Sequence, residues 1–284
     1  MHNVARKGRS DMHNLHARSR YPRQATLANT EREPCSRVSC ARIQNEIRNA
    51  ISGASEVHSA LCSPERQRKG RLEIASRVVP ARHIGGDFVL SFDAGSQAIA
   101  VVGDLMGKGL SAAMWITHLI DLVYRAGEGF ESTAGMMERL NNELVRSRVH
   151  APLTSAFLLA ADPASGAVSY SSGGHPPAVL VRSDGSTELL NHGGPLLGVF
   201  ADARYASKSV QLCPGDAVVA FSDGLVEAHN NDDEEFSTER VCHSLAANAG
   251  ASASDKLRAL LTAADDFAGG KRLDDISVVV VQHT

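Results

Sequence analysis

The sequence predicts an α+β protein built as a four-layer sandwich, in which two antiparallel β-sheets lie between helices on both outer faces. Three observations predict this class. First, short apolar segments alternate with turns of Gly, Pro, Asp and Ser, which is typical of antiparallel strands. Second, two pairs of segments with helical periodicity interrupt the strands, at residues 111–149 and 238–268. Third, 284 residues of which 43% are hydrophobic can form one large domain with a substantial core.

Composition and charge argue against several other classes of protein. A formal net charge of −3 gives no reason to expect binding to nucleic acid or to a membrane surface. No apolar run approaches the ~20 residues that a membrane-spanning helix needs, and residues 1–10 contain no apolar signal segment. The five cysteines show no CxxC pair, which favours reduced thiols in a cytoplasmic protein.

The beginning of the chain is expected to lie outside the compact domain. Residues 1–34 are polar and without periodicity, which predicts a disordered tail. Residues 35–70 are predicted to form a helix and a polar linker, because apolar residues four or five positions apart give an amphipathic helix over 36–62. This helix has two possible partners, the domain itself or a second copy of the chain. The domain is predicted to span residues 71–284.

The first part of the predicted domain contains a β-hairpin. A strand over residues 72–80 is followed by strands over 88–92 and 98–102, with the turn Asp-Ala-Gly-Ser between the last two. In an antiparallel hairpin the start of the first strand lies beside the end of the second. We therefore expect Asp87 and Asp104 to lie side by side at one end of a sheet.

The middle of the chain is predicted to contain two helices and then a series of strands. Ser132 is the expected N-cap of the second helix. The predicted helices cover residues 111–125 and 132–149, and the predicted strands cover 154–161, 167–171, 178–182 and about 207–212. Two further helices are predicted over about 238–248 and 254–268.

A second pair of acidic residues repeats the arrangement of the first. The predicted strand 217–221 ends at a Ser-Asp-Gly sequence that contains Asp223, so an acidic residue again follows an apolar strand. Asp274 precedes the last predicted strand, 276–281. If the two strands are antiparallel neighbours, Asp223 and Asp274 meet at one end of their sheet.

These four acidic residues predict a metal site if the two pairs converge. A carboxylate cluster whose motifs contain one basic residue, Lys108, is unfavourable without cations. Ligands that are all oxygen favour Mg²⁺ or Mn²⁺ over zinc. Two such ions about 3.5–4 Å apart can bridge a water, lower its pKa and direct it at a phosphorus atom, so that no Cys or Ser nucleophile is needed.

Six short motifs, taken in order, resemble the bacterial SpoIIE/RsbU-type branch of the PP2C-like (PPM family) metal-dependent serine/threonine protein phosphatases. They are GGDF at 85–88, GDLMGKG at 103–109, GHPP at 174–177, PGD at 214–216, SDG at 222–224 and DDIS at 274–277. Each motif alone is common, but six in the order of the family, spread over about residues 71–282, make the resemblance specific.

The resemblance implies a centre of two Mn²⁺ or Mg²⁺ ions that activates a water to hydrolyse phosphoserine or phosphothreonine. Asp87 and Asp104 would be the bridging and first-metal carboxylates, and the carbonyl oxygen of Leu105 would complete one metal site. Asp223 and Asp274 would hold the second metal.

The resemblance also implies partners. The usual substrate in this family is a STAS-type anti-anti-sigma factor in bacterial partner-switching signalling, which regulates a sigma factor. Residues 36–62 lie where relatives often carry a regulatory or dimerising helix, which implies a homodimer or an activator. The alternative to an enzyme is a catalytically silent regulatory binding module that keeps the fold and recognises such a partner. The complete set of acidic residues favours the enzyme.

The roles of three other residues stay open at this point. Asp275 is ranked behind Asp274 as a ligand and is expected to support it. Lys108 can stabilise its turn or the phosphoryl group, and His175 can act as a general acid or as a structural residue.

Overall fold

The computed structural model describes residues 37–62, 66–82, 84–107, 109–147 and 151–284. The predicted disordered tail, residues 1–34, therefore lies outside the described residues, as does Lys108. The chain divides into two units, residues 1–44 and 45–284. The described part of the first unit is the beginning of helix α1 (Arg37–Cys62), and the second unit contains all the strands. The predicted domain boundary at residue 71 stays a prediction.

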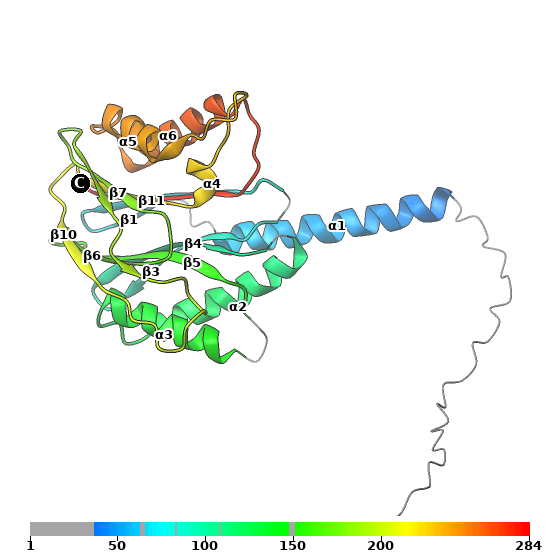
Figure 1. Ribbon diagram of the computed structural model, residues 1–284, viewed down its shortest axis with the longest axis horizontal. Helices are drawn as coiled ribbons and strands as arrows, with labels where there is room; N and C mark the ends of the chain where they lie inside the picture. Colours follow the sequence, from blue (N-terminus) through cyan, green and yellow to red (C-terminus); the bar gives the residue numbers. More distant parts are fainter. Residues whose placement is uncertain (1–36, 63–65, 83, 108, 148–150) are drawn as a thin grey trace, which may run out of the picture. The chain divides into compact units, whose positions relative to one another are not determined.

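The second unit contains two six-stranded sheets (Figure 1). The first has the order β1 (Gln67–Lys69), β2 (Leu72–Val79), β12 (Ile276–His283), β11 (Ala217–Phe221), β7 (Ala178–Val181) and β8 (Thr187–Leu190). The second has the order β10 (Lys208–Gln211), β6 (Ala167–Gly173), β5 (Thr154–Ala161), β4 (Gln97–Leu105) and β3 (Asp87–Ala94), with β9 (Gly193–Gly194) beside β6. All neighbouring strands are antiparallel except β6 and β9.

Helices cover the outer face of each sheet, so the predicted four-layer sandwich is confirmed (Figure 1). Helices α2 (Leu110–Gly127) and α3 (Thr133–Arg146) pack on the sheet that contains β3, β4 and β5. Helices α5 (Ser237–Ala247) and α6 (Ala253–Phe267) pack on the other sheet, together with the single turn α4 (Asp223–Val226). As predicted, Ser132 caps α3, because its side chain accepts a hydrogen bond from the Gly135 N–H at 3.1 Å.

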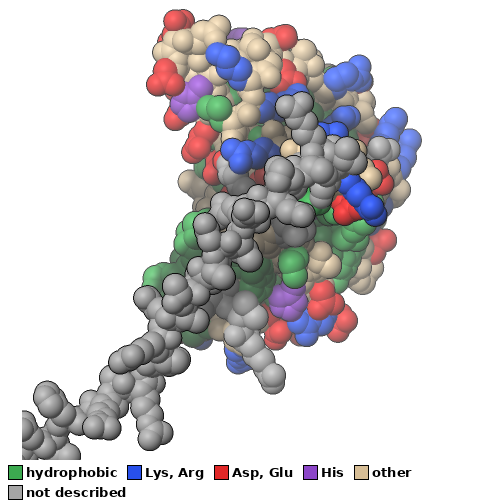
Figure 2. Space-filling model, turned by 90° about the vertical axis from the view of Figure 1, so that its right-hand side faces the viewer, with side chains coloured by type: hydrophobic (Ala, Val, Ile, Leu, Met, Phe, Trp, Pro, Cys, Tyr) green, Lys and Arg blue, Asp and Glu red, His purple; other side chains and the backbone are tan. Residues whose placement is uncertain are grey.

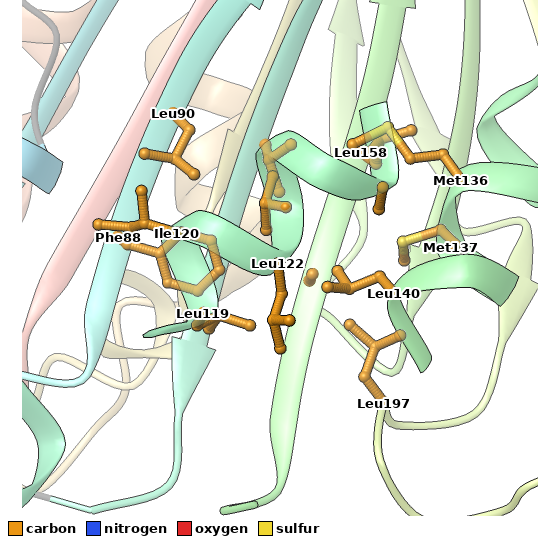
Figure 3. Close-up of a cluster of buried hydrophobic side chains, with 14 of the residues drawn as sticks. Phe88, Leu90, Leu119, Ile120, Leu122, Met136, Met137, Leu140, Leu158 and Leu197 are labelled. Atoms are coloured by element: carbon orange, nitrogen blue, oxygen red, sulfur yellow. The ribbon is translucent and has the colours of Figure 1, made fainter. Parts of the chain in front are cut away.

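Three hydrophobic clusters hold the layers together. One lies between the two sheets, and one lies between each sheet and its helices. Figure 3 shows part of the cluster under α2 and α3, with Leu119, Ile120, Leu122, Met136, Met137 and Leu140 of the helices and Phe88, Leu90 and Leu158 of the strands.

Helix α1 confirms the predicted helix over residues 36–62, but its buried side chains are not those of the predicted apolar stripe. His58 and Cys62, one turn apart, are buried, and Cys62 belongs to the cluster under α2 and α3. Ile43 and Ile47 of the predicted stripe are 50% and 54% exposed. None of the described helices is both long enough and apolar enough to cross a lipid bilayer.

Candidate metal centre

The hairpin of β3 and β4 places the first two acidic residues opposite each other. Asp87 and Asp104 are partners in the antiparallel register, so the prediction that they lie side by side is confirmed. The strand β4 continues to Leu105, three residues past its predicted end, because residues 103–105 pair with the beginning of β5. Asp104 therefore lies within a strand, which fixes its backbone more firmly than a turn would.

The strands β11 and β12 bring the second pair together. They are antiparallel neighbours in which Phe221 lies opposite Val278, so Asp223 and Asp274 lie beyond the same end of the pair. The chains come very close there, since a Cβ atom on Gly224 would lie 2.0 Å from the Asp275 carbonyl oxygen and 3.3 Å from the Asp274 Cβ. The predicted meeting of Asp223 and Asp274 is confirmed.

One buried hydroxyl joins the two pairs across the sheets. The Ser222 Oγ donates a hydrogen bond to the Asp87 Oδ2 at 2.6 Å and accepts one from the Ser277 N–H at 2.9 Å. Ser222 directly follows β11 of one sheet, whereas Asp87 begins β3 in the other, so this hydroxyl ties the sheets together where the acidic residues gather. The sequence analysis noted Ser222 as part of a motif and missed this bond.

The carboxylates of the cluster raise one another's pKa values. Burial, followed by the charge of Asp104, raises the pKa of Asp87 well above its ordinary value. Burial, followed by the charges of Asp223 and Asp274, raises the pKa of Asp104 to about 6. The cluster also runs from buried Asp87, which is 2% exposed, to the exposed side chain of Asp274, so it opens toward solvent.

The donor chemistry fits hard divalent cations. Among the residues that the structure describes, no three His, Cys, Asp or Glu side chains are already arranged to hold an ion. Repulsion between carboxylates opposes such an arrangement when no ion is bound. A cation between the carboxylates removes that repulsion. The donors are carboxylate oxygens and the Leu105 carbonyl, a set that suits Mg²⁺ or Mn²⁺.

A tight loop holds Leu105 and Asp87 in place. The Leu105 N–H donates to the Gly86 carbonyl at 3.0 Å, and a Cβ on Gly86 would lie 2.2 Å from the Leu105 carbonyl oxygen. The Asp275 carboxylate accepts hydrogen bonds from the Ala81 N–H at 2.8 Å and the Gly86 N–H at 3.0 Å. Both oxygens of Asp275 are therefore engaged with the loop that leads to Asp87.

The side chain of His175 is buried next to the strand partner of Asp104. Its ring is buried, its Nδ1 lies 2.7 Å from the Ser155 Oγ, and Ser155 is the β5 partner of Asp104. Burial lowers the pKa of His175 to about 3, so the ring is neutral in ordinary buffers. A neutral, buried imidazole is a poor general acid, and this favours the structural role over the catalytic one.

The end of α1 also lies beside the cluster, which the sequence analysis did not foresee. Burial lowers the pKa of His58, while the Asp275 charge and the Gly85 backbone oppose that shift. Burial, followed by the Asp87 charge, raises the pKa of the Cys62 thiol to about 12. The available signal was Cys62, because cysteine is among the residues most often buried, and His58 lies one turn before it on the same face.

The fold and the site together define a class of protein. Two antiparallel sheets between helix layers, with carboxylates at the same end of both sheets, form the sandwich of PP2C phosphatase domains. The structure is similar to the SiaA-PP2C domain of Pseudomonas aeruginosa, with a TM-score of 0.74 at 19% identity, over 86% of this chain and 100% of that one. It is also similar to the PP2C phosphatase domain of SpoIIE from Bacillus subtilis, with a TM-score of 0.65 at 18% identity, over 76% and 64% of the two chains.

The sequence gives the particular family. The family described as Stage II sporulation protein E (SpoIIE) matches residues 94–284, and the chain belongs to it. The Bacillus subtilis phosphoserine phosphatase RsbU is 26% identical over 187 residues, which are 65% of this chain and 56% of that protein. Protein IcfG of Synechocystis is 26% identical over 232 residues, which are 71% of this chain and 36% of that protein.

The chain thus spans about a third to just over half of the length of these two relatives. The predicted resemblance to the SpoIIE/RsbU-type branch of the PP2C phosphatases is confirmed.

Proposed function

We propose that this chain is a metal-dependent protein phosphatase that hydrolyses phosphoserine or phosphothreonine with an activated water. The observation that carries the proposal is the convergence of two acidic pairs from separate sheets, with the pKa of Asp104 raised to about 6 partly by Asp223 and Asp274. Such mutual repulsion persists in a fold only if something compensates it, and bound cations are the simplest compensation. Membership of the SpoIIE family supports the same function.

Each residue of the cluster has a role in this proposal. Asp87, Asp104 and the Leu105 carbonyl would hold one of two Mn²⁺ or Mg²⁺ ions. Asp223 and Asp274 would hold the second. When bound, the two ions would lower the pKa of a water molecule. Their positive charge would also stabilise the phosphoryl group in the transition state.

Other residues prepare the site. The Ser222 hydroxyl binds the Oδ2 of Asp87 and thereby sets the orientation of that carboxylate. Asp275 fixes the loop before Asp87 through the Gly86 N–H.

The test is hydrolysis of p-nitrophenyl phosphate in EDTA, Mg²⁺ or Mn²⁺, comparing the wild type with Asp223→Asn. The expected result is turnover that needs a metal and is lost in the variant. Asp232→Asn is the matched control, because Asp232 is exposed in a loop outside the cluster and undergoes the same chemical change. Equal turnover in Asp223→Asn and Asp232→Asn would refute the assignment.

The substrate that we propose is a phosphorylated STAS-type anti-anti-sigma factor in partner-switching signalling. Two observations on relatives support it: RsbU carries the name phosphoserine phosphatase, and a similar solved structure contains the RsbU and RsbW domains of Rv1364c from Mycobacterium tuberculosis. Release of phosphate from a phosphorylated STAS domain, at a higher kcat/KM than from p-nitrophenyl phosphate, is the expected outcome.

The alternative is a catalytically silent binding module with the same fold. It predicts a folded chain that binds the STAS domain and turns over neither substrate with either metal. Circular dichroism and the two assays above separate the alternatives.

We also propose that α1 contacts a second copy of the chain or an activator. Five small or apolar residues lie three and four positions apart on one side of the helix, which is the spacing of a coiled-coil seam. These residues are Ile47, Ala50, Ala54, Val57 and Leu61, and the three large ones are 54%, 59% and 41% exposed. Light scattering of the wild type and of Ile47→Lys tests the dimer, which the substitution is expected to weaken.

A further inference from the structure

We infer that a groove beside the acidic cluster binds an acidic segment of the phosphoprotein substrate. The inference rests on the proposed function, because it assigns the surface that recognises the substrate of the same site. The groove has a volume of about 410 Å³ and lies where α6 covers β2 and the start of β12. Three arginines line its walls, and apolar side chains form its floor.

The groove is continuous with the acidic cluster. A smaller hollow of about 140 Å³ is lined by Gly224 and Asp274 of the cluster. The two hollows share Asp265, Arg272 and Ile276, so they adjoin on either side of these residues. A peptide whose phosphorylated residue lies at the cluster can therefore extend along the groove.

Arginines outnumber carboxylates in the lining of the groove, and two of the three arginines are paired with an aspartate. Arg77, Arg258 and Arg272 line it, against the single carboxylate of Asp265. Arg272 binds Asp265 through two hydrogen bonds of 3.0 Å and 2.7 Å, so that pair is neutral. Arg258 pairs with Asp255, which does not line the groove.

Arg77 is the group most available to a ligand. It lies on β2, its side chain is exposed, and within the described parts of the chain no side-chain hydrogen bond or ion pair of Arg77 is present. On the face drawn in Figure 2, most Lys and Arg side chains lie in the upper half, which contains the layer of α5 and α6 in Figure 1. Asp and Glu side chains lie among them in the same view, so the cation that this layer offers to a ligand is the single side chain of Arg77 and not a uniformly basic surface.

The floor of the groove restricts the kind of ligand. Val79, Leu257, Leu261 and Ile276 line it, so its base is apolar while its rim is cationic. A free inorganic anion would use the rim alone. A peptide segment that carries both Glu or Asp and apolar side chains uses rim and floor together, and arginine forks match carboxylates well.

The test uses two synthetic phosphoserine peptides of equal length with the same apolar residues. One has Glu on both sides of the phosphoserine, and the other has Gln at those positions. The expected result is a higher kcat/KM for the Glu peptide, a preference that weakens as salt is added. Arg77→Gln should reduce the preference by about fivefold, the upper end for an exposed ion pair, and Arg77→Lys should restore most of it.

Arg204→Gln is the matched control, because the Arg204 side chain is 79% exposed and does not line the groove. It should leave the preference unchanged. Equal kcat/KM for the two peptides with the wild type, or an equal loss in Arg77→Gln and Arg204→Gln, would overturn the inference.

A binding measurement keeps this test separate from the proposed function. Fluorescence anisotropy of a labelled, unphosphorylated Glu peptide in EDTA reports on the groove without turnover. Tighter binding of the Glu peptide than of the Gln peptide, lost in Arg77→Gln, supports the groove even if no metal gives turnover. Absence of that difference overturns the groove even if phosphatase activity is present.

Discussion

Ser222 offers the sharpest test of how the two sheets organise the acidic cluster. Its hydroxyl is buried and serves two partners at once, the Asp87 carboxylate at 2.6 Å and the Ser277 N–H at 2.9 Å. Ser222→Ala removes one oxygen atom, breaks both hydrogen bonds and leaves the backbone unchanged. The substitution therefore isolates the link between β11, β12 and β3.

The expected loss of stability follows from the two bonds. The Ser277 N–H would be left buried without a partner, which costs about 1–3 kcal/mol. The bond to Asp87 adds about 1.5–3 kcal/mol when that carboxylate is ionised. Because the pKa of Asp87 is raised by burial and by Asp104, this second part should be small at low pH and should grow as the carboxylate ionises. A total of about 2.5–6 kcal/mol is expected once Asp87 is ionised, out of the ~5–15 kcal/mol of an ordinary domain.

Urea unfolding followed by the fluorescence of Trp115, the one tryptophan of the chain, measures this loss. Ser209→Ala is the matched control, since Ser209 is exposed on β10. It should unfold within about 0.5 kcal/mol of the wild type. The slope of the free energy of unfolding against urea concentration should be the same for the wild type and both variants. A shift of the midpoint then reports a change in stability alone.

The reasoning would be refuted if Ser222→Ala unfolded at the same urea concentration as Ser209→Ala. It would also be refuted if the loss were the same at pH 4 and pH 8, because the contribution of the Asp87 hydrogen bond must depend on ionisation.

Three further predictions concern the loop, the metal and the histidine. Gly86→Ala should lower the free energy of unfolding by about 1–3 kcal/mol, because its Cβ would lie 2.2 Å from the Leu105 oxygen, whereas Gly250→Ala meets no atom within 4 Å and should be neutral by the same urea measurement. Because the folded-state pKa of Asp104, about 6, lies above its ordinary 3.8, the folded chain holds this proton more tightly than the unfolded chain. Asp104 therefore favours the metal-free fold below about pH 4, and that contribution is lost as the pH rises through about 6. Calorimetric titration should accordingly show Mn²⁺ affinity falling roughly tenfold per pH unit below pH 6, and a pH-independent affinity would contradict the role of Asp104. The ring of His175, whose pKa is lowered to about 3, should show no titration by NMR between pH 5 and pH 8; a midpoint in that range would show that it is not buried as described.

Local sequence patterns were sufficient for the hairpin and for the pairing of its acidic residues. The predicted turn 93–96 is shorter in the structure, where only Gly95 and Ser96 connect β3 to β4. This two-residue turn fixes the register, and register alone sets Asp87 opposite Asp104. The same holds for Asp223 and Asp274 once β11 and β12 are neighbours, because both residues adjoin the ends of short, strongly apolar strands.

The extent of β4 and the burial of α1 depended on partners distant in the sequence. β4 reaches Leu105 because β5, about fifty positions later, supplies hydrogen bonds to residues 103–105. The apolar stripe of α1 predicted a buried face, but the side chains buried against the domain are those of His58 and Cys62. Periodicity shows that a helix has two faces and does not show which one meets a neighbour.

The sequence by itself determined the longer helices and strands, the order of the motifs and the four carboxylates, because strands, turns and caps depend on residues a few positions apart. The short elements β1, β8, β9 and α4 were not predicted. Tertiary structure alone decided how those carboxylates are held. The bond from Ser222 to Asp87 spans 135 positions, and the bond from Asp275 to Gly86 spans 189. The environment of a buried charge depends on every segment packed around it, and no local pattern contains that information.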